Sequence, residues 1–169
     1  MESKAKLLGH PVHQMLVAFP LGLLATGVLF DIVYFATDNT TFAHVAYWVI
    51  IGGIVGGLVA APFGFVDWLR AIPAGTRAKR IGAIHGGGNL IVVLLFIGSA
   101  ILRAGMPEDP SAWAYVLSFV GAGLALVTAW LGGELVDRLG VGVYSDANAD
   151  APSSVGRHAA MPHRTVGSH

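Results

Sequence analysis

Four long apolar runs dominate this sequence, and they restrict the chain to membrane architectures. The runs cover residues 15–35, 42–66, 84–102 and 113–135. An α-helix rises about 1.5 Å per residue, so about 20 apolar residues cross a hydrocarbon core of about 30 Å. The pattern therefore predicts an all-α integral membrane protein with four spanning helices, joined up and down into a four-helix bundle.

The composition agrees with this class and narrows the possible chemistry. Hydrophobic residues make up 54% of the chain and charged residues 12%, whereas charged residues are about 25% of an ordinary soluble domain. The formal net charge is zero, so no overall positive field favours nucleic acid as a partner. The absence of cysteine excludes disulfides, thiolate metal sites and iron–sulfur clusters. Histidine and carboxylate remain as strong ligands.

The segments between the runs predict turns and a tail. The first run is longer than the 7–15 apolar residues of a signal-peptide core, so we expect it to be retained. Asp38 and Asn39 favour a turn with helix capping, and Ser111 is a candidate cap for the last helix. The polar residues 144–169 predict a disordered tail that follows a membrane domain of residues 1–143.

The distribution of basic residues predicts the orientation. Those flanking one set of helix ends are Lys4, Lys6, Arg70, Arg77, Lys79, Arg80 and Arg138. Only Arg103 flanks the other set. The positive-inside rule therefore places both termini in the cytoplasm, and we expect a multi-pass protein of the bacterial inner membrane, with the lipid bilayer as its surroundings.

Two stripes of small residues predict close helix packing. They are Gly52, Gly56, Ala60 and Gly64 in the second run, and Gly121, Ala125, Ala129 and Gly133 in the fourth. Small residues at four-residue spacing allow helix backbones to approach each other in lipid. We expect the stripes to pack the bundle internally, with homodimerisation as the alternative.

Polar residues gather at the predicted cytoplasmic ends of all four runs. They are His10 and His13 before the first run, Asp67 after the second, His85 with Asn89 at the start of the third, and Glu134 at the end of the fourth. Ionisable residues at membrane depth are candidates for function. At the other side, ionisable residues such as Asp31 and Arg103 are expected to be scattered over loops and helix ends.

The helix dipole suggests how these groups complement each other. We expect His13 and His85 in the first turns of their helices, where the partial positive charge keeps an imidazole neutral and able to act as a ligand. Asp67 and Glu134 end their helices, where a carboxylate needs a compensating cation. A cofactor or metal would supply that cation and use the imidazoles.

The alternative interpretation of the same residues is purely structural. It pairs Asp67 with Arg70, and Glu134 with Arg138 at a favourable four-residue spacing. The histidines are then interfacial or capping residues.

Two kinds of cofactor site fit this set. His13 and His85 suit the axial positions of a non-covalent haem b, with Gly64, Gly86–Gly88 and Gly133 making room for the macrocycle. Alternatively, His10, His13, His85, Asp67 and Glu134 suit a non-haem iron, copper, manganese or zinc ion. The sequence assigns no catalytic residue. The tail histidines His158, His163 and His169 are expected to be solvated.

The motifs that open and close the membrane domain resemble a bacterial family. The opening stretch runs from Gly9 to Pro20 (GHPVHQMLVAFP), and the closing stretch from Gly132 to Val143 (GGELVDRLGVGV). With Asp67, His85 and Asn89, they are similar to small four-span membrane proteins catalogued as a domain of unknown function. The family often has proline where this chain has Gln14. The resemblance implies the four-span topology and a role for the shared histidines and carboxylates. Some relatives are associated with haem or cytochrome contexts, which favours a redox interpretation.

Three functions follow as hypotheses. The first is a haem- or metal-binding protein for electron transfer. The second is a non-catalytic accessory subunit of a larger membrane complex, in which the polar cluster is a hydrogen-bond network. The third, a small transporter, is disfavoured because the ionisable residues gather at one face and do not step through the midplane.

Overall fold

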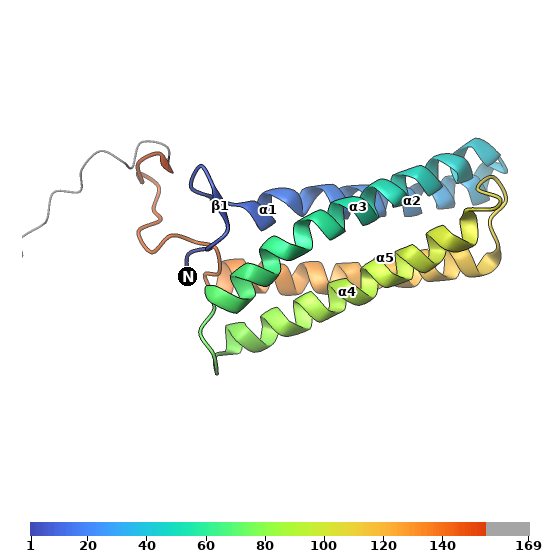
Figure 1. Cartoon of the computed structure of the whole chain (residues 1–169). Coiled ribbons are helices and arrows are strands. Elements are labelled where there is room, and N and C mark those ends of the chain that lie inside the picture. Colours follow the sequence, from blue (N-terminus) through green and yellow to red (C-terminus); the bar gives the residue numbers. More distant parts are fainter. Residues whose placement is uncertain (155–169) are drawn as a thin grey trace, which may run out of the picture.

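The computed structural model describes residues 1–154, which form a bundle of long helices (Figure 1). A short hairpin of β1 (Lys6–Leu7) and β2 (His10–Pro11) precedes α1 (Val12–Leu16) and α2 (Ala18–Thr37). The remaining helices are α3 (Thr40–Arg70), α4 (Arg77–Arg103), α5 (Ala112–Gly133) and the π-helix η1 (Glu134–Arg138). The prediction of an all-α, up-and-down four-helix bundle is confirmed.

The four spans are longer than the apolar runs that predicted them. Helical segments long and apolar enough to cross a membrane cover residues 12–37, 40–70, 77–103 and 112–138. Each therefore extends beyond the hydrocarbon thickness that about 20 residues fill. The extra turns place polar residues at both ends of the bundle.

Local capping explains where two of the helices begin. Asn39 precedes α3, and its side-chain oxygen accepts a hydrogen bond from the amide of Thr41 at 3.0 Å. Thr76 precedes α4 and accepts from the amide of Lys79 at 3.1 Å. Both bonds satisfy amides that a helix start leaves unpaired. Ser111 occupies the expected position before α5, but its side chain makes no capping bond.

The helices pair as two hairpins, α2 with α3 and α4 with α5, and a narrow apolar core joins them (Figure 1). The buried core residues are Leu24, Val28, Ile50, Ile54, Val92, Phe96 and Ala100. Large side chains such as Phe65, Leu126 and Trp130 remain exposed on the outside. An exposed apolar exterior is what a lipid-facing bundle requires, since lipid is as apolar as the side chains.

Glycines hold the helices of each hairpin close together. A Cβ on Gly53 would lie 2.6 Å from Leu24, and one on Gly121 would lie 3.0 Å from Phe96. In the expected α3 stripe, a Cβ on Gly56 would lie 3.3 Å from Pro20 and one on Gly64 would lie 2.7 Å from His13, so this stripe packs internally. In α5 the C-terminal half of the expected stripe does not face the bundle. Ala129 is exposed, and a Cβ on Gly133 would meet nothing within 4 Å. Gly132, one position earlier, faces the bundle instead.

The N-terminal hairpin and the start of the tail lie together at one end of the bundle. The Tyr144 hydroxyl donates to the Gly9 carbonyl at 2.5 Å, and the Ser154 hydroxyl donates to the Leu8 carbonyl at 3.2 Å. The N-terminal ammonium of Met1 donates to the Gly140 carbonyl at 2.6 Å. Residues 144–154 thus contact the hairpin. The rest of the predicted tail, with His158, His163 and His169, lies outside the described residues.

Candidate functional site

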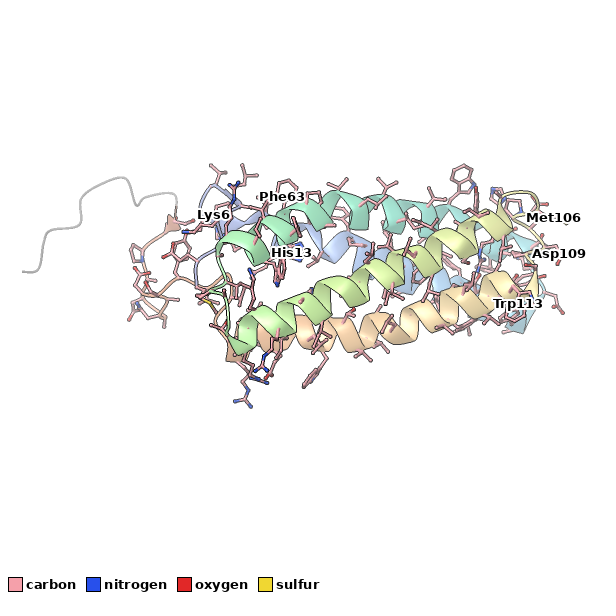
Figure 2. All side chains as sticks on the ribbon, turned by 60° about the horizontal axis from the view of Figure 1, so that its bottom comes forward. Lys6, His13, Phe63, Met106, Asp109 and Trp113 are labelled. Carbon is pink, nitrogen blue, oxygen red and sulfur yellow. The ribbon has the colours of Figure 1, made fainter. Side chains whose placement is uncertain are left out.

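His13 lies inside the bundle, where α1 leads into the first span (Figure 2). Its Nδ1 is 3.0 Å from the carbonyl oxygen of Ala60 in α3. A carbonyl only accepts, so this contact assigns the hydrogen to Nδ1. The ring lies against Gly64, where a Cβ would approach it to 2.7 Å. Glycine is therefore the residue that makes room for the imidazole.

His85 has a matching environment in the other hairpin. Its Nδ1 is 2.9 Å from the carbonyl oxygen of Thr128 in α5, which again places the hydrogen on Nδ1. A Cβ on Gly132 would lie 3.1 Å from its Cε1 atom. Each histidine thus donates to a carbonyl of the neighbouring helix and rests on a glycine four residues further along that helix.

The two hairpins therefore present two imidazoles in the same chemical form. With hydrogen on Nδ1, a neutral ring keeps its lone pair on Nε2. Metal-ligating histidines are commonly oriented in this way, by donating the other ring N–H to a carbonyl. The two residues that the sequence proposed as axial ligands therefore share one ring form.

The expected helix-dipole effect applies to only one of these histidines. His13 is in the first turn of α1, as predicted. The prediction for His85 was wrong, because α4 begins at Arg77 and His85 lies about two turns further along. The basic segment before the third apolar run is helical, so the backbone amides around His85 are already paired. The Thr128 carbonyl fixes the position of its ring instead.

Asn89 and Thr128 connect His85 to α5. The Asn89 amide donates to Nε2 of His85 at 3.2 Å and to the His85 carbonyl at 3.0 Å. Its side-chain oxygen accepts from the Thr128 hydroxyl at 2.9 Å. The imidazole orientation is therefore fixed from two helices. A ligand at Nε2 would replace one of the two Asn89 donor contacts.

Asp67 is buried at the end of α3, but its partners are in the N-terminal segment. Its carboxylate accepts from the Ser3 hydroxyl at 2.6 Å and from the amides of Lys4 at 2.7 Å and Ala5 at 3.1 Å. These donors offset the unfavourable position of an anion at a helix C-terminus. Asp67 therefore fixes the first residues of the chain and has no contact with Arg70 among its hydrogen bonds.

The same segment carries a surface ion pair. The Lys6 ammonium lies 2.6 Å from the Glu2 carboxylate and 4.2 Å from the ring centre of Tyr144. The hydrogen bond from Lys6 to Glu2 is the largest cause that raises the pKa of Lys6 above its usual value of 10.5. Lys6 therefore stays protonated at neutral pH and helps to hold residue 144 against the hairpin.

Glu134 forms an ion pair between the two ends of the second hairpin. Its Oε1 accepts from Nη2 of Arg77 at 2.6 Å, so its partner is Arg77, at the start of α4, and not Arg138. The Glu134 side chain is 16% exposed and the Arg77 side chain 57%. This contact ties η1 to the start of α4.

His10 is exposed on β2, and its Nε2 lies 3.2 Å from the Ser154 hydroxyl. The expected five-residue metal set therefore separates in space into the histidine pair, two structural carboxylates and a surface histidine. Within residues 1–154, no three or more His, Asp or Glu side chains come together as a metal site.

The glycines expected to admit a macrocycle also divide. A Cβ on Gly64 or Gly88 would meet His13 or Thr128, so both face the interior. Gly86, Gly87 and Gly133 are exposed, and a Cβ added at any of them would meet nothing within 4 Å. Of the glycines expected to make room for a macrocycle, only Gly64 and Gly88 face the interior of the bundle.

Sequence reasoning missed a second polar cluster at the opposite end of the bundle. Asp31 of α2 and Arg103 of α4 are fully buried and form two hydrogen bonds, of 2.8 and 2.7 Å. Arg103 also donates to Ser99 at 3.1 Å and to Ser118 at 3.3 Å. Asp31 and Arg103 have opposite charges and lie at the same depth on two parallel spans, α2 and α4. This match in depth was the signal in the sequence that could have predicted the pair.

Comparison with known proteins gives a family but no characterised relative. No curated protein matches the chain, and no solved structure matches it. One family model matches residues 9–145, which include the histidine pair, Asp67 and Glu134. The chain therefore belongs to the family described as "Predicted membrane protein (DUF2231)".

Proposed function

We propose that His13 and His85 are the axial ligands of a b-type haem, and that the protein carries electrons within the membrane. The observation that supports this most is the shared form of the two imidazoles. Each is held by a carbonyl at Nδ1, at 3.0 and 2.9 Å, which leaves Nε2 as the ligand atom. At His85 a ligand would take the place of the Asn89 amide on Nε2.

The donor set favours haem over a bare metal ion. A porphyrin supplies four nitrogens, so two imidazoles complete the coordination of its iron. Zinc, copper, manganese or non-haem iron take four or more ligands from side chains and water. Within the described chain no third His, Asp or Glu joins the histidine pair. His13 and His85 would hold the haem through Nε2, and a haem held by two imidazoles would supply one-electron transfer.

The charge distribution supports a cytoplasmic location for the histidine end. Arg103, the one basic residue expected at the opposite end, is buried and paired with Asp31. Among residues 1–154, every other Lys and Arg therefore flanks the histidine end. By the positive-inside rule, both helix-bundle termini would face the cytoplasm of a bacterial inner membrane.

One observation favours the accessory-subunit alternative. Ala83, Gly86 and Gly87 form an exposed strip of small residues on α4, beside the level of His85. Small residues on a lipid-facing surface allow another helix to approach closely. In this alternative the His85, Asn89 and Thr128 network is purely structural, and a partner helix covers the strip.

The two functions differ in one measurement. The protein purified in detergent is examined by optical spectroscopy, air-oxidised and then reduced, with elemental analysis of the same sample. We expect a Soret band that shifts on reduction and is lost in His13→Ala and in His85→Ala. His10→Ala is the matched control, because His10 contacts Ser154 at the surface, and it should keep the band.

Two results would contradict the haem proposal. A colourless protein with stoichiometric iron, copper, manganese or zinc would move the histidines to a non-haem site. A protein with neither haem nor metal, even when both are supplied during expression, would favour the accessory subunit.

A further inference from the structure

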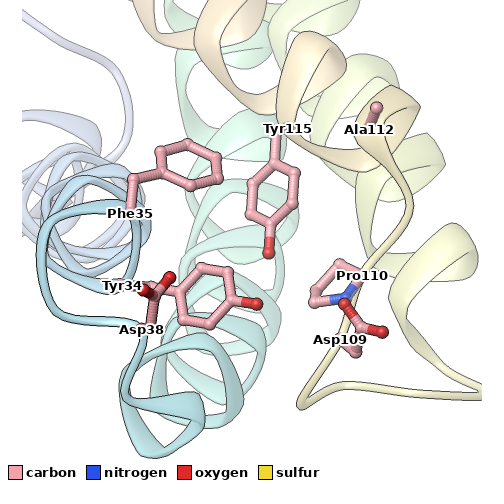
Figure 3. Close-up of a pocket in the computed structure, with 7 residues that line it drawn as sticks. All are labelled: Tyr34, Phe35, Asp38, Asp109, Pro110, Ala112 and Tyr115. Atoms are coloured by element: carbon pink, nitrogen blue, oxygen red, sulfur yellow. The ribbon is translucent and has the colours of Figure 1, made fainter.

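A cavity opens at the end of the bundle opposite His13 and His85. It has a volume of about 460 Å³ and lies between the end of α2 and the loop that precedes α5 (Figure 3). Tyr34 and Phe35 of α2 and Tyr115 of α5 form its aromatic lining, and Asp38 and Asp109 add two carboxylates. Five groups from three segments of the chain therefore converge on one space.

The Tyr115 hydroxyl is buried without a hydrogen-bond partner. Tyr115 is 8% exposed, and its hydroxyl oxygen is the buried side-chain polar atom that lacks a partner within residues 1–154. Figure 3 shows this hydroxyl pointing toward the space between the Tyr34 ring and Pro110. Buried polar groups are normally paired, so this hydroxyl is available as a partner for a polar ligand.

The aromatic rings form a continuous surface. The ring centres of Phe35 and Tyr115 are 4.6 Å apart, and those of Tyr34 and Tyr115 are 6.2 Å apart. The faces of aromatic rings carry partial negative charge, which attracts cations and ammonium groups in particular. The surface therefore suits the cationic end of an organic molecule.

The nearby charges add up to an acidic site. The Arg103 guanidinium lies 4.9 Å from the centre of the Tyr115 ring, behind the cavity, but Asp31 neutralises it through two hydrogen bonds. Glu108 is turned toward His44, at 3.8 Å. Within the described chain, Asp38 and Asp109 form no ion pair. A ligand with positive charge would balance these two carboxylates.

We propose that this cavity binds a protonated primary amine. A primary ammonium group has three N–H donors, which match the Tyr115 hydroxyl oxygen and the carboxylates of Asp38 and Asp109. A quaternary ammonium ion would contact the rings but would leave the hydroxyl unpaired. The hydroxyl thus selects the primary amine over the quaternary one. This inference is independent of the haem proposal, which concerns the other end of the bundle.

The amine has two possible sources at a membrane surface. One is a free small amine in the aqueous phase, and the other is the ethanolamine headgroup of phosphatidylethanolamine. Asp38 and Asp109 lie in the segments that connect the spans, so both sources can reach the cavity.

Calorimetric titration of the detergent-solubilised protein with ethanolamine hydrochloride tests the free amine. We expect saturable binding, with tetramethylammonium chloride at equal ionic strength binding at least about tenfold more weakly. Asp109→Asn and Tyr115→Phe should each weaken ethanolamine binding by about tenfold, the effect of one hydrogen bond to a charged group. Glu108→Gln is the matched control and should bind as the wild type does.

Tyr115→Phe keeps the ring and removes only the unpaired hydroxyl, so it should fold normally. We expect its melting temperature without ligand to equal or exceed that of the wild type. Any loss of binding in this variant can then be assigned to the hydroxyl.

Native mass spectrometry after reconstitution into phosphatidylethanolamine and phosphatidylglycerol vesicles tests the lipid source. If the wild type retains phosphatidylethanolamine and Asp109→Asn does not, while free ethanolamine fails to bind, the headgroup is the ligand. The proposal is overturned if neither amine binds in preference to tetramethylammonium or phosphatidylglycerol. It is also overturned if the wild type, Asp109→Asn and Tyr115→Phe all bind the amine equally.

Discussion

Arg103 and Asp31 are 72 positions apart in the sequence, yet their side chains form two parallel hydrogen bonds inside the bundle, with no exposure to solvent. Their bonds of 2.8 and 2.7 Å connect α2 with α4. A bidentate pair of this kind fixes the relative height of two helices, because a shift along either axis breaks both bonds. It joins the two hairpins at the end of the bundle opposite His13 and His85.

Removing one member of this pair should be costly. We expect Arg103→Leu to destabilise the protein by about 3–5 kcal/mol, because it leaves the Asp31 carboxylate buried without a partner. The double variant Asp31→Leu/Arg103→Leu should lose much less, since it removes both charges. Reversible unfolding in mixed micelles measures the difference.

The control for this experiment is the exposed pair of Glu2 and Lys6. Glu2→Gln should cost less than about 1 kcal/mol, because solvent screens a surface ion pair. Equal losses in Arg103→Leu and in the double variant would contradict the prediction, since the unpaired charge would then contribute nothing.

A single methyl group should displace His13. In Gly64→Ala the new Cβ would lie 2.7 Å from the imidazole, so either the ring or α3 must move. We expect a loss of about 1–3 kcal/mol from overpacking, together with a reduced Soret band if haem is bound. Thermal unfolding and the optical spectrum measure these two effects.

Gly133→Ala is the matched control, because its Cβ would meet nothing within 4 Å. Alanine is the better helix former by about 1 kcal/mol, so this variant should be as stable as the wild type or more so. If Gly64→Ala behaved in the same way, the close contact between Gly64 and His13 would be wrong.

Asp67 should control the order of the N-terminus. We expect Asp67→Ala to release residues 3–5, because its carboxylate accepts from the amides of Lys4 and Ala5. Hydrogen exchange should show these two amides losing protection. In Glu134→Gln, which weakens the contact with Arg77 only, they should stay protected. Unchanged exchange in Asp67→Ala would show that other contacts hold the segment.

The natural absence of cysteine makes the orientation directly measurable. Single cysteines are introduced at Ser111, before α5, and at Ser145, after η1, both of which are exposed. With both termini in the cytoplasm, an impermeant maleimide should label Ser111→Cys in intact spheroplasts and Ser145→Cys only after lysis. The opposite labelling pattern would reverse the orientation.

The number of helices and their turns could be predicted because they depend on local properties. Run length and hydropathy are enough for four spans, and Asn39 caps α3 through its own short side chain. The boundaries were harder. The helix α4 begins at Arg77, before the third apolar run, and includes basic residues that lie outside that run. The helical periodicity of a sequence is the same in water and in lipid, so it does not show where the membrane begins.

The candidate site was predictable in its residue types and less so in its pairings. His13 and His85 lie at the same end of the bundle, since topology alone brings the starts of the first and third spans there. The partners of Asp67 and Glu134 depend on how the N-terminus folds back and on the register of α4, which a single sequence does not encode locally. The pairing of Asp31 with Arg103 required comparing depths on two separate spans.

The π-helix η1 has a consequence for the length of the closing segment. Its winding places the amide of Leu139 on the carbonyl of Glu134, five residues earlier. Relative to an α-helix, this turn holds one residue more, and one residue corresponds to about 100° of rotation. The extra residue directs Gly142 toward Met1, whose carbonyl it contacts at 2.7 Å. Deleting any one residue between 134 and 138 would turn the following chain away from the N-terminus. The length of this stretch is therefore constrained, even at positions where the side chain is free to vary.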